Sequence, residues 1–198
     1  MASICVYCAS SQSAPPEYVE LATRVGAEIA RRGHALVSGG GSISAMGAVA
    51  RAARAGGAHT TGVIPELLLR LEVGDIEADE LVVVDDMRVR KGEMERRSDA
   101  FIALPGGIGT LEELVEIWVG SVLGFHTKPL VVVDPDDHYA GLRLQARTMV
   151  ERGLVKQAAV DRLVWVRGVE EALDSVETLL VALPPADPDV EDLLEAEP

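Results

Sequence analysis

One segment decides the fold of this chain: Ala100-Phe101-Ile102-Ala103-Leu104-Pro105-Gly106-Gly107-Ile108-Gly109-Thr110-Leu111-Glu112-Glu113. It starts with a short run that is apolar at every position, continues through three glycines, and is expected to enter a helix near Thr110. A strand that is apolar at every position is typical of a parallel sheet covered on both faces. The segment therefore predicts one strand–turn–helix unit of an α/β protein.

The same alternation of apolar runs and helical stretches extends along the chain. Strands are predicted at Ser3–Ala9, Ala35–Ser38, Thr60–Ile64, Leu81–Val84, Ala100–Leu104, Pro129–Val133 and Leu163–Val166. Helices are predicted at Pro16–Arg32, Ser44–Ala55, Met87–Arg97, Thr110–Leu123, Tyr139–Glu151 and Val169–Leu183. This order predicts a single doubly wound, Rossmann-like domain over residues 1–183, with one parallel sheet and helices on both faces.

The composition is that of a soluble globular protein, with 198 residues, 48% of them hydrophobic and 25% charged. The net charge is −14, and residues 184–198 hold six acidic side chains and no Lys or Arg, so this tail is expected to be disordered. The rest of the chain is still acidic, which argues against nucleic acid and anionic membranes as partners. Because no apolar run approaches the ~20 residues that span a bilayer and no basic leader is present, we expect a cytoplasmic protein.

Two cysteines, Cys5 and Cys8, have the C-x-x-C spacing of a redox pair. They lie in a predicted strand, however, where residues three apart point to opposite faces of the sheet. We therefore expect two separate thiols and no redox site.

A first glycine-rich turn, Ser38-Gly39-Gly40-Gly41-Ser42-Ile43-Ser44-Ala45-Met46-Gly47, joins a predicted strand to a predicted helix. Its glycines would let backbone N–H groups face an anion at the start of the helix. Ser44 stands where a dinucleotide fingerprint would have its third glycine, and no P-loop sequence occurs. A tight turn that requires small residues would explain the same pattern.

The second glycine-rich turn, Gly106–Thr110, also suits a phosphate, because the unpaired N–H groups and the dipole of a helix start both favour an anion. Thr110-x-x-Glu113 is equally a capping box, in which the glutamate binds the N-cap N–H group. Glu112, Glu113 and Glu116 together could instead be a solvated acidic face that complements the helix dipole.

Between the two turns, Met87–Arg97 contains five of the eighteen Lys and Arg residues of the chain. Glu93 and Glu95 are interleaved with them, so a salt-bridged helix face is one interpretation. A basic cluster directly before the second glycine turn of an acidic protein also indicates an anion site. The residues alone leave both interpretations open.

These motifs resemble the LOG (Lonely Guy) family of cytokinin riboside 5′-monophosphate phosphoribohydrolases. The family pattern P-G-G-x-G-T-x-x-E is matched at Pro105–Glu113, Met87-x-x-Arg90-Lys91-x-x-Met94 precedes it, and the earlier G-G-G-x-x-x-x-M-G stretch also matches. The resemblance covers about Ile4 to Leu180. It departs from the family at Ser44, where many members have Gly, and at Val119 and Gly120, where a Thr-Trp pair is usual.

The resemblance implies hydrolysis of the N-glycosidic bond of an adenine-type nucleoside 5′-monophosphate, with Arg90 and Glu113 as the catalytic residues. It implies substrate or phosphate contacts at Gly40, Gly41, Met46, Gly47, Glu72, Arg90, Lys91, Gly106, Gly107, Ile108, Gly109, Thr110 and Glu112. Glu113 is expected to stay ionised because it lies in the first turn of its helix. No metal or other cofactor is expected, since the four histidines form no ligand pattern.

The resemblance also implies at least a homodimer with active sites near the subunit interface, and the helix after the second turn is apolar over more than one face, as a helix in a core or an interface is. Family members have often been described as lysine decarboxylases, but only three lysines occur and the motifs describe a phosphate site. Two alternatives remain: a non-catalytic nucleotide-binding or carrier protein on the same scaffold, and a general purine 5′-nucleotide nucleosidase.

Overall fold

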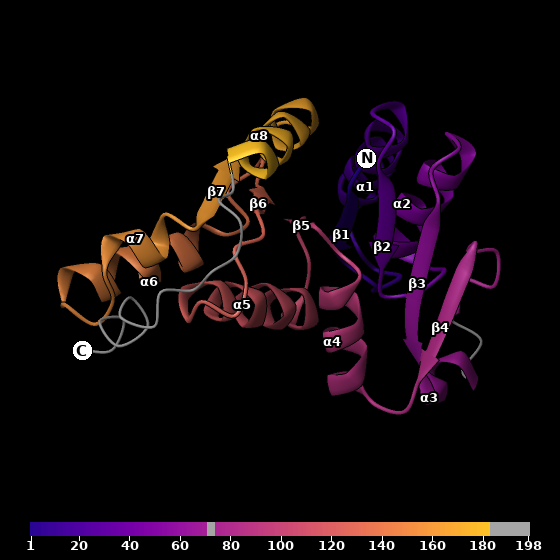
Figure 1. The fold of residues 1–198 in the computed structure, drawn as a ribbon, viewed down its shortest axis with the longest axis horizontal. Helices are drawn as coiled ribbons and strands as arrows, with labels where there is room; N and C mark the ends of the chain where they lie inside the picture. Colours follow the sequence, from indigo (N-terminus) through magenta and orange to yellow (C-terminus); the bar gives the residue numbers. More distant parts are fainter. Residues whose placement is uncertain (71–73, 183–198) are drawn as a thin grey trace.

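The computed structural model describes residues 1–70 and 74–182, so Glu72 and the acidic tail lie outside the described residues. Its core is a sheet of seven strands in the order β4-β3-β2-β1-β5-β6-β7 (Figure 1). All neighbouring strands are parallel. The strands are β1 (Ser3–Tyr7), β2 (Ala35–Ser38), β3 (Thr60–Pro65), β4 (Glu80–Val84), β5 (Ala100–Ala103), β6 (Leu130–Val133) and β7 (Leu163–Val166).

Helices cover both faces of this sheet. They are α1 (Pro16–Arg31), α2 (Ser44–Ala55), α3 (Glu66–Arg70), α4 (Met87–Arg96), α5 (Ile108–Val122), α6 (Ala140–Glu151), α7 (Gln157–Val160) and α8 (Val169–Ala182). One core cluster joins α1, α2 and α8 to the sheet, and a second joins α4, α5 and α6 to the other face (Figure 1). The predicted doubly wound α/β domain is confirmed.

The strand order reverses between β1 and β5, and ligands of such sheets bind outside the carboxyl ends of the strands at this point. Both glycine-rich turns lie at carboxyl ends of strands, the first after β2 and the second after β5. The fold therefore brings the two turns to the same edge of the sheet.

The two cysteines lie as expected. Cys5 packs in the core under α4, α5 and α6, whereas Cys8 packs in the core under α1, α2 and α8. Both thiols are free and buried, and burial raises the pKa of Cys5 to about 12. No redox pair is formed.

Two short helices, α3 and α7, were not predicted from the sequence, because five and four residues are too few to show a helical period. Within the described residues, no helix is both long and apolar enough to cross a membrane.

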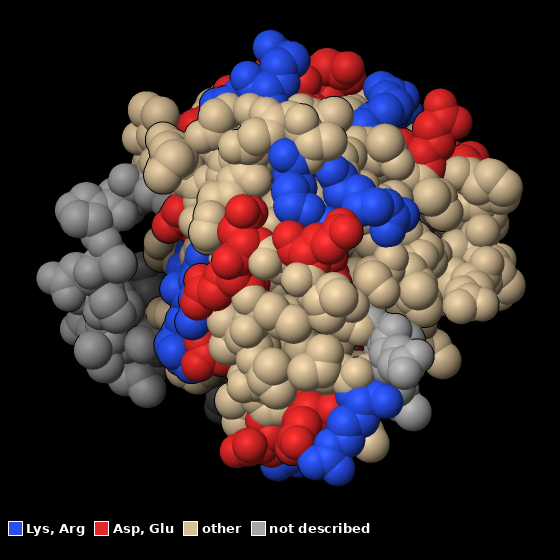
Figure 2. Space-filling model, turned by 90° about the vertical axis from the view of Figure 1, so that its right-hand side faces the viewer, with Lys and Arg blue, Asp and Glu red and all other residues tan. Residues whose placement is uncertain are grey.

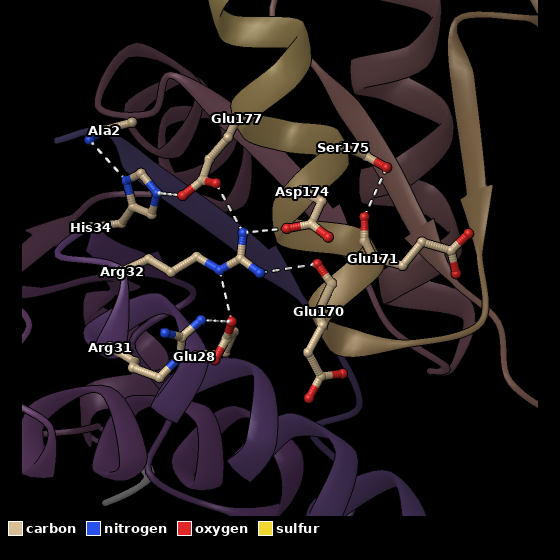
Figure 3. Close-up of polar contacts among 10 residues, drawn as sticks. All are labelled: Ala2, Glu28, Arg31, Arg32, His34, Glu170, Glu171, Asp174, Ser175 and Glu177. Carbon is tan, nitrogen blue, oxygen red and sulfur yellow. Dashed lines mark hydrogen bonds and ion pairs between the residues drawn. The ribbon is translucent and has the colours of Figure 1, made fainter.

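A charge cluster centred on the largely buried Arg32 and Glu28 ties α1 to α8 (Figure 3). The Arg32 guanidinium, at the C-cap of α1, donates to Glu28 (2.7 Å), Asp174 (2.7 Å) and Glu177 (2.9 Å). His34 binds Glu177 through Nε2 (3.0 Å) and accepts the backbone N–H of Ala2 at Nδ1 (3.2 Å). The Arg31 and Arg32 hydrogen bonds lower the pKa of Glu28 to about 2. One arginine thus holds three carboxylates from two helices.

We predict that Arg32→Met lowers the free energy of unfolding by about 2 kcal/mol, because the largely buried Glu28 loses one of its two cations and α8 loses its charged hydrogen bonds to Arg32. The matched control is Arg31→Met, since Arg31 is exposed and contacts only Glu28 within the cluster. The control should change stability little. Urea denaturation of both variants measures the difference, and equal losses would show that Arg32 is no more important than a surface charge.

Candidate active site

Arg90 of α4 and Glu113 of α5 form a buried ion pair at the carboxyl edge of the sheet. Arg90 Nη1 donates to Glu113 Oε1 at 2.7 Å, and Arg90 Nε donates to the Val63 carbonyl of β3 at 3.1 Å. Only 6% of the Arg90 side chain and 8% of the Glu113 side chain are exposed. The two catalytic candidates therefore meet in a largely water-free place, where each charge depends on the other.

Helix α4 presents Arg90 because its start is fixed by Asp86. The Asp86 carboxylate accepts the backbone N–H groups of Arg88 (2.8 Å) and Val89 (2.9 Å), which is the ordinary role of an N-cap aspartate. Arg90 then faces the sheet, whereas Met87 and Val89 are exposed. Local sequence thus sets which basic side chain of the cluster is buried.

The first glycine turn lies against Arg90. A Cβ atom on Gly39 would be 1.7 Å from Arg90 Nη2, so a side chain there would displace the guanidinium. The same Cβ would be 3.1 Å from Met46 Sδ, which also places Met46 beside Arg90. Gly40 has a positive φ of 71° and Gly47 has no room for a Cβ, which would lie 1.9 Å from the Ser42 carbonyl oxygen. Close backbone approach therefore explains these glycines without any ligand.

The second glycine turn corrects one prediction. Helix α5 begins at Ile108 with Gly107 as its N-cap, two residues earlier than expected. Thr110 does not cap the helix, because its hydroxyl donates to the Cys8 carbonyl at 3.0 Å, and Glu113 binds Arg90 instead of an N-cap N–H group. The capping-box interpretation is wrong, and so is the interpretation of Glu113 as part of a solvated face.

The ionisation of Glu113 is controlled by burial and by Arg90. Burial raises the pKa of the Glu113 carboxyl above its ordinary value, and the charge and hydrogen bond of Arg90 act in the opposite direction. Glu113 lies in the second turn of α5, where the dipole of the helix start has largely faded. The expected dipole effect is thus replaced by a direct ion pair.

The other basic residues of the cluster divide into two groups. Arg96 and Arg97 pair with Glu93, and Arg97 also pairs with Glu80, as the salt-bridged interpretation predicted. Lys91 pairs with Glu112 and with Glu116 (2.5 Å). Burial acts to lower the pKa of Lys91, but the two glutamates outweigh this effect, so the pKa is raised above its ordinary value.

On the side of the molecule in Figure 2, Lys and Arg side chains lie directly beside Asp and Glu side chains. The ion pairs of Lys91, Arg96 and Arg97 largely neutralise the basic cluster, and Arg90, which pairs with Glu113, is its buried member.

A pocket of about 140 Å³ lies between α4 and α5. It is lined by Tyr7, Arg88, Lys91, Gly92, Glu95, Glu113, Glu116 and Ile117. Neither glycine turn is part of its lining, so the structure brings Glu113 and Lys91 to the pocket and leaves Gly40, Gly41, Gly106, Gly107 and Gly109 outside it. Among the described residues, no group of three or more His, Cys, Asp or Glu side chains could hold a metal ion.

Tyr7 was not expected at the site. It ends β1 at the reversal of strand order, stacks on Phe101 with 5.9 Å between the ring centroids, and lines the pocket beside Glu113. Burial raises its pKa well above the ordinary value, so its hydroxyl stays protonated. From the sequence, Tyr7 could have been found only by its position at the carboxyl end of the central strand, where ligands of such sheets bind.

Comparison with known proteins shows the family of this chain. A family profile described as "Possible lysine decarboxylase" matches residues 46–176. A cytokinin riboside 5′-monophosphate phosphoribohydrolase of Mycobacterium tuberculosis is 53% identical over 86% of this chain and 91% of its own length. A phosphoribohydrolase of the same name from Arabidopsis thaliana is 41% identical over 88% of this chain and 80% of its own length. The chain belongs to the LOG family.

Two solved structures resemble this LOG protein at lower sequence identity than these relatives. The molybdenum cofactor binding protein of Rippkaea orientalis has a TM-score of 0.69 and 19% identity, over 90% of this chain and 97% of its own. A molybdenum cofactor carrier protein of Chlamydomonas reinhardtii has a TM-score of 0.67 and 20% identity, over 91% and 98%. At these identities the likeness shows the fold alone.

Ser44, a departure from the LOG pattern, has two unfavourable features. It is a non-glycine residue with a positive φ of 54°, and its buried hydroxyl has no hydrogen-bond partner among the described residues. It also opens α2, directly after the first glycine turn. A side chain in the left-handed region costs roughly 1–2 kcal/mol.

We predict that Ser44→Gly stabilises this LOG protein by about 1 kcal/mol and raises Tm by about 2–4 °C, because glycine adopts this φ without strain. Ser44→Ala is the matched control: it removes the hydroxyl and keeps the Cβ atom. Differential scanning calorimetry should give a clearly smaller gain for the alanine variant, and equal gains would assign the cost to the hydroxyl instead.

Proposed function

We propose that this protein hydrolyses the N-glycosidic bond of cytokinin riboside 5′-monophosphates and AMP, releasing the free base and ribose 5-phosphate. The observation that carries this proposal is the buried Arg90–Glu113 pair at the carboxyl edge of the sheet, between two glycine turns. The 53% identity to a phosphoribohydrolase of Mycobacterium tuberculosis supports the reaction class.

Glu113 supplies the negative charge that glycosidic cleavage needs. As the bond from the anomeric carbon to the base nitrogen breaks, its electron pair goes to the base and the ribose becomes an oxocarbenium-like cation. Arg90 engages Oε1 of the carboxylate, so we assign Oε2 to face the cation and the attacking water. Water adds its oxygen to the anomeric carbon and one of its protons passes to Glu113. Glu113 then gives this proton to the departing base, which restores the carboxylate.

Arg90 keeps this carboxylate usable. Burial favours the protonated carboxyl, which can neither stabilise a cation nor act as a base, and the guanidinium counteracts that tendency. Its planar fork also fixes the carboxylate orientation, and we assign Nη2, beside Gly39, to a ribose hydroxyl or phosphate oxygen of the substrate.

The 5′-phosphate is assigned to the second glycine turn. The first N–H groups of α5 have no partner within the helix, and the three glycines of the turn permit close approach. Ile108 and Thr110 contribute through their backbones in this assignment, since the Thr110 hydroxyl is held by Cys8. Lys91, Glu112, Glu72 and the first turn (Gly40, Gly41, Met46, Gly47) remain proposed contacts to phosphate or substrate.

A carrier protein and a lysine decarboxylase explain the residues of this site less well than a hydrolase does. A carrier protein on this scaffold needs an anion site but has no use for a buried carboxylate beside it. Decarboxylation of lysine with a pyridoxal cofactor would need a Schiff-base lysine, and Lys91 is ion-paired with two glutamates. A general purine 5′-nucleotide nucleosidase would use the same site and differ only in its base preference.

We also propose a homodimer that meets near this site. Apolar side chains of α5 and its C-terminal end are exposed on one monomer: Ile108 (88%), Leu111, Val119, Leu123 and Phe125 (78%). Met87 and Val89, on the neighbouring α4, are exposed as well. Apolar surface of this kind beside a site marks a protein–protein contact. The cytoplasmic location stays a prediction from the sequence.

The central prediction concerns Glu113→Gln. Glutamine can still accept the Arg90 hydrogen bond, but it is neutral and is no base, so kcat for base release from saturating AMP should fall about 10²-fold or more. The variant should lose roughly 1–3 kcal/mol of stability, since the Arg90 charge is left without its partner. Chromatography of the released base measures the rate, and circular dichroism checks the fold.

The control for this change is Glu93→Gln, which removes a carboxylate on α4 that pairs only with Arg96 and Arg97. It should keep turnover within about twofold. If Glu113→Gln also turns over within a few-fold of the unchanged protein, Glu113 is structural and the carrier alternative gains support.

Substrate recognition should depend on the 5′-phosphate. The anion site described above has no equivalent for an uncharged sugar, so kcat/KM for adenosine and for cytokinin ribosides should be at least about 10²-fold below that of their monophosphates. Paired assays of AMP with adenosine, and of N6-isopentenyl AMP with its riboside, test this. Equal values within a pair would remove the phosphate from the recognition scheme.

A further inference from the structure

His138 contacts the second glycine turn from outside. It lies on the loop that follows β6, and its Nε2 atom is 2.9 Å from the carbonyl oxygen of Gly106. A carbonyl oxygen only accepts hydrogen bonds, so Nε2 must carry the hydrogen and donate it. His138 is exposed and belongs to none of the sequence motifs.

The imidazole ring is held in place on two sides. Tyr139 packs against it edge-on with 4.8 Å between the centroids, and Tyr18 of α1 does so at 5.7 Å. The Tyr18 hydroxyl donates to Asp136 (2.7 Å), and Asp137 pairs with Arg143 (2.5 Å) and Arg167 (3.0 Å). The loop that carries His138 is thus attached to α1, α6 and the segment after β7.

The next residue, Tyr139, also binds the second glycine turn. The Tyr139 hydroxyl donates to the Leu104 carbonyl at 2.7 Å, so residues 138 and 139 together bind carbonyl groups on both sides of Pro105. On the inner side, the Thr110 hydroxyl is fixed to Cys8, and Gly106 fits tightly because a Cβ there would lie 2.3 Å from Thr110 Oγ1. The turn is therefore held from both sides.

The hydrogen bond from His138 sets the orientation of one peptide group. In a planar trans peptide the C=O of one residue and the N–H of the next point in opposite directions. Binding of the Gly106 C=O by His138 therefore turns the Gly107 N–H away from His138. Gly107 is the N-cap of α5, where the free N–H groups of the helix start gather.

We propose that His138 is a positioning residue for the 5′-phosphate: through the Gly106 carbonyl, it aims the Gly107 N–H group at the anion site of α5. This inference rests on the proposed function for the identity of the phosphate ligand. A purely structural role for His138 would need only the packing of its ring against Tyr18 and Tyr139. The positioning role also needs the hydrogen on Nε2, so the two roles can be distinguished.

The test uses two variants of His138 in the full chain. His138→Phe keeps an aromatic ring between the two tyrosines and removes the donor, whereas His138→Gln restores an N–H donor. The first should raise KM for AMP, and Kd for ribose 5-phosphate measured by calorimetry, about fivefold to tenfold. Its kcat, and its kcat/KM for adenosine, should stay within about twofold, and the glutamine variant should recover most of the loss.

The matched control is His59→Phe, at an exposed histidine in the segment before β3, which should leave all of these values unchanged. Equal losses of kcat/KM for AMP and adenosine in His138→Phe, no loss for either, or no recovery by His138→Gln would overturn the inference. The NMR shift of the Gly107 amide on adding ribose 5-phosphate gives a second measurement, expected to be large in the unchanged protein and small in His138→Phe.

The calorimetric arm separates this inference from the proposed function. If the unchanged protein binds ribose 5-phosphate but releases no base from AMP, the proposed function fails while the three Kd values still decide the role of His138. If base is released and all variants bind ribose 5-phosphate equally, the function stands and His138 is structural. Absence of ribose 5-phosphate binding in the unchanged protein would overturn the inference about His138, whereas the proposed function is decided by base release from AMP.

Discussion

The buried ion pair of Arg90 and Glu113 is the constraint to which the surrounding structure is fitted. Two opposite charges in a poorly solvated place are tolerated only when further hydrogen bonds satisfy their remaining polar groups. Here β3 supplies the Val63 carbonyl, and the first glycine turn leaves space for the guanidinium because Gly39 has no side chain. Segments from both halves of the sheet are therefore fixed relative to each other by one arginine.

Most of the fold could be predicted from the sequence because buried parallel strands leave an unmistakable pattern. Strands such as Ala35–Ser38 and Leu163–Val166 were predicted to the residue, since each is a short, mainly apolar run between turns. The start of α5 was misplaced for a physical reason. Thr110-x-x-Glu113 has the same spacing in a capping box and in a site glutamate, and only the tertiary structure shows the Thr110 hydroxyl bound to Cys8, which is 102 residues away.

Some features of the candidate site could likewise be predicted from the sequence, and others are visible only in the structure. The motif singled out Arg90 and Glu113, which the structure pairs, but it could not show that burial raises the pKa of Glu113 while Arg90 opposes that change. Nor could it show that Lys91 is neutralised by Glu112 and Glu116, since those pairs join α4 to α5 across the fold. Tyr7 and His138 belong to no motif, and only the structure places them at this edge of the sheet.

The charges of the site favour an enzyme over a carrier on this fold. A protein that only holds an anion gains nothing from a buried carboxylate, which repels the ligand and would be replaced by an apolar side chain with little loss or even a gain of stability. A cation that exists only during the reaction reverses this balance, because the carboxylate then attracts the transition state more strongly than the substrate. Backbone N–H groups of α5 can hold the phosphate without adding mobile charge near Glu113. The proposed site thus separates an anion-binding end from a cation-stabilising end, which is the arrangement that glycosidic cleavage of a nucleotide requires.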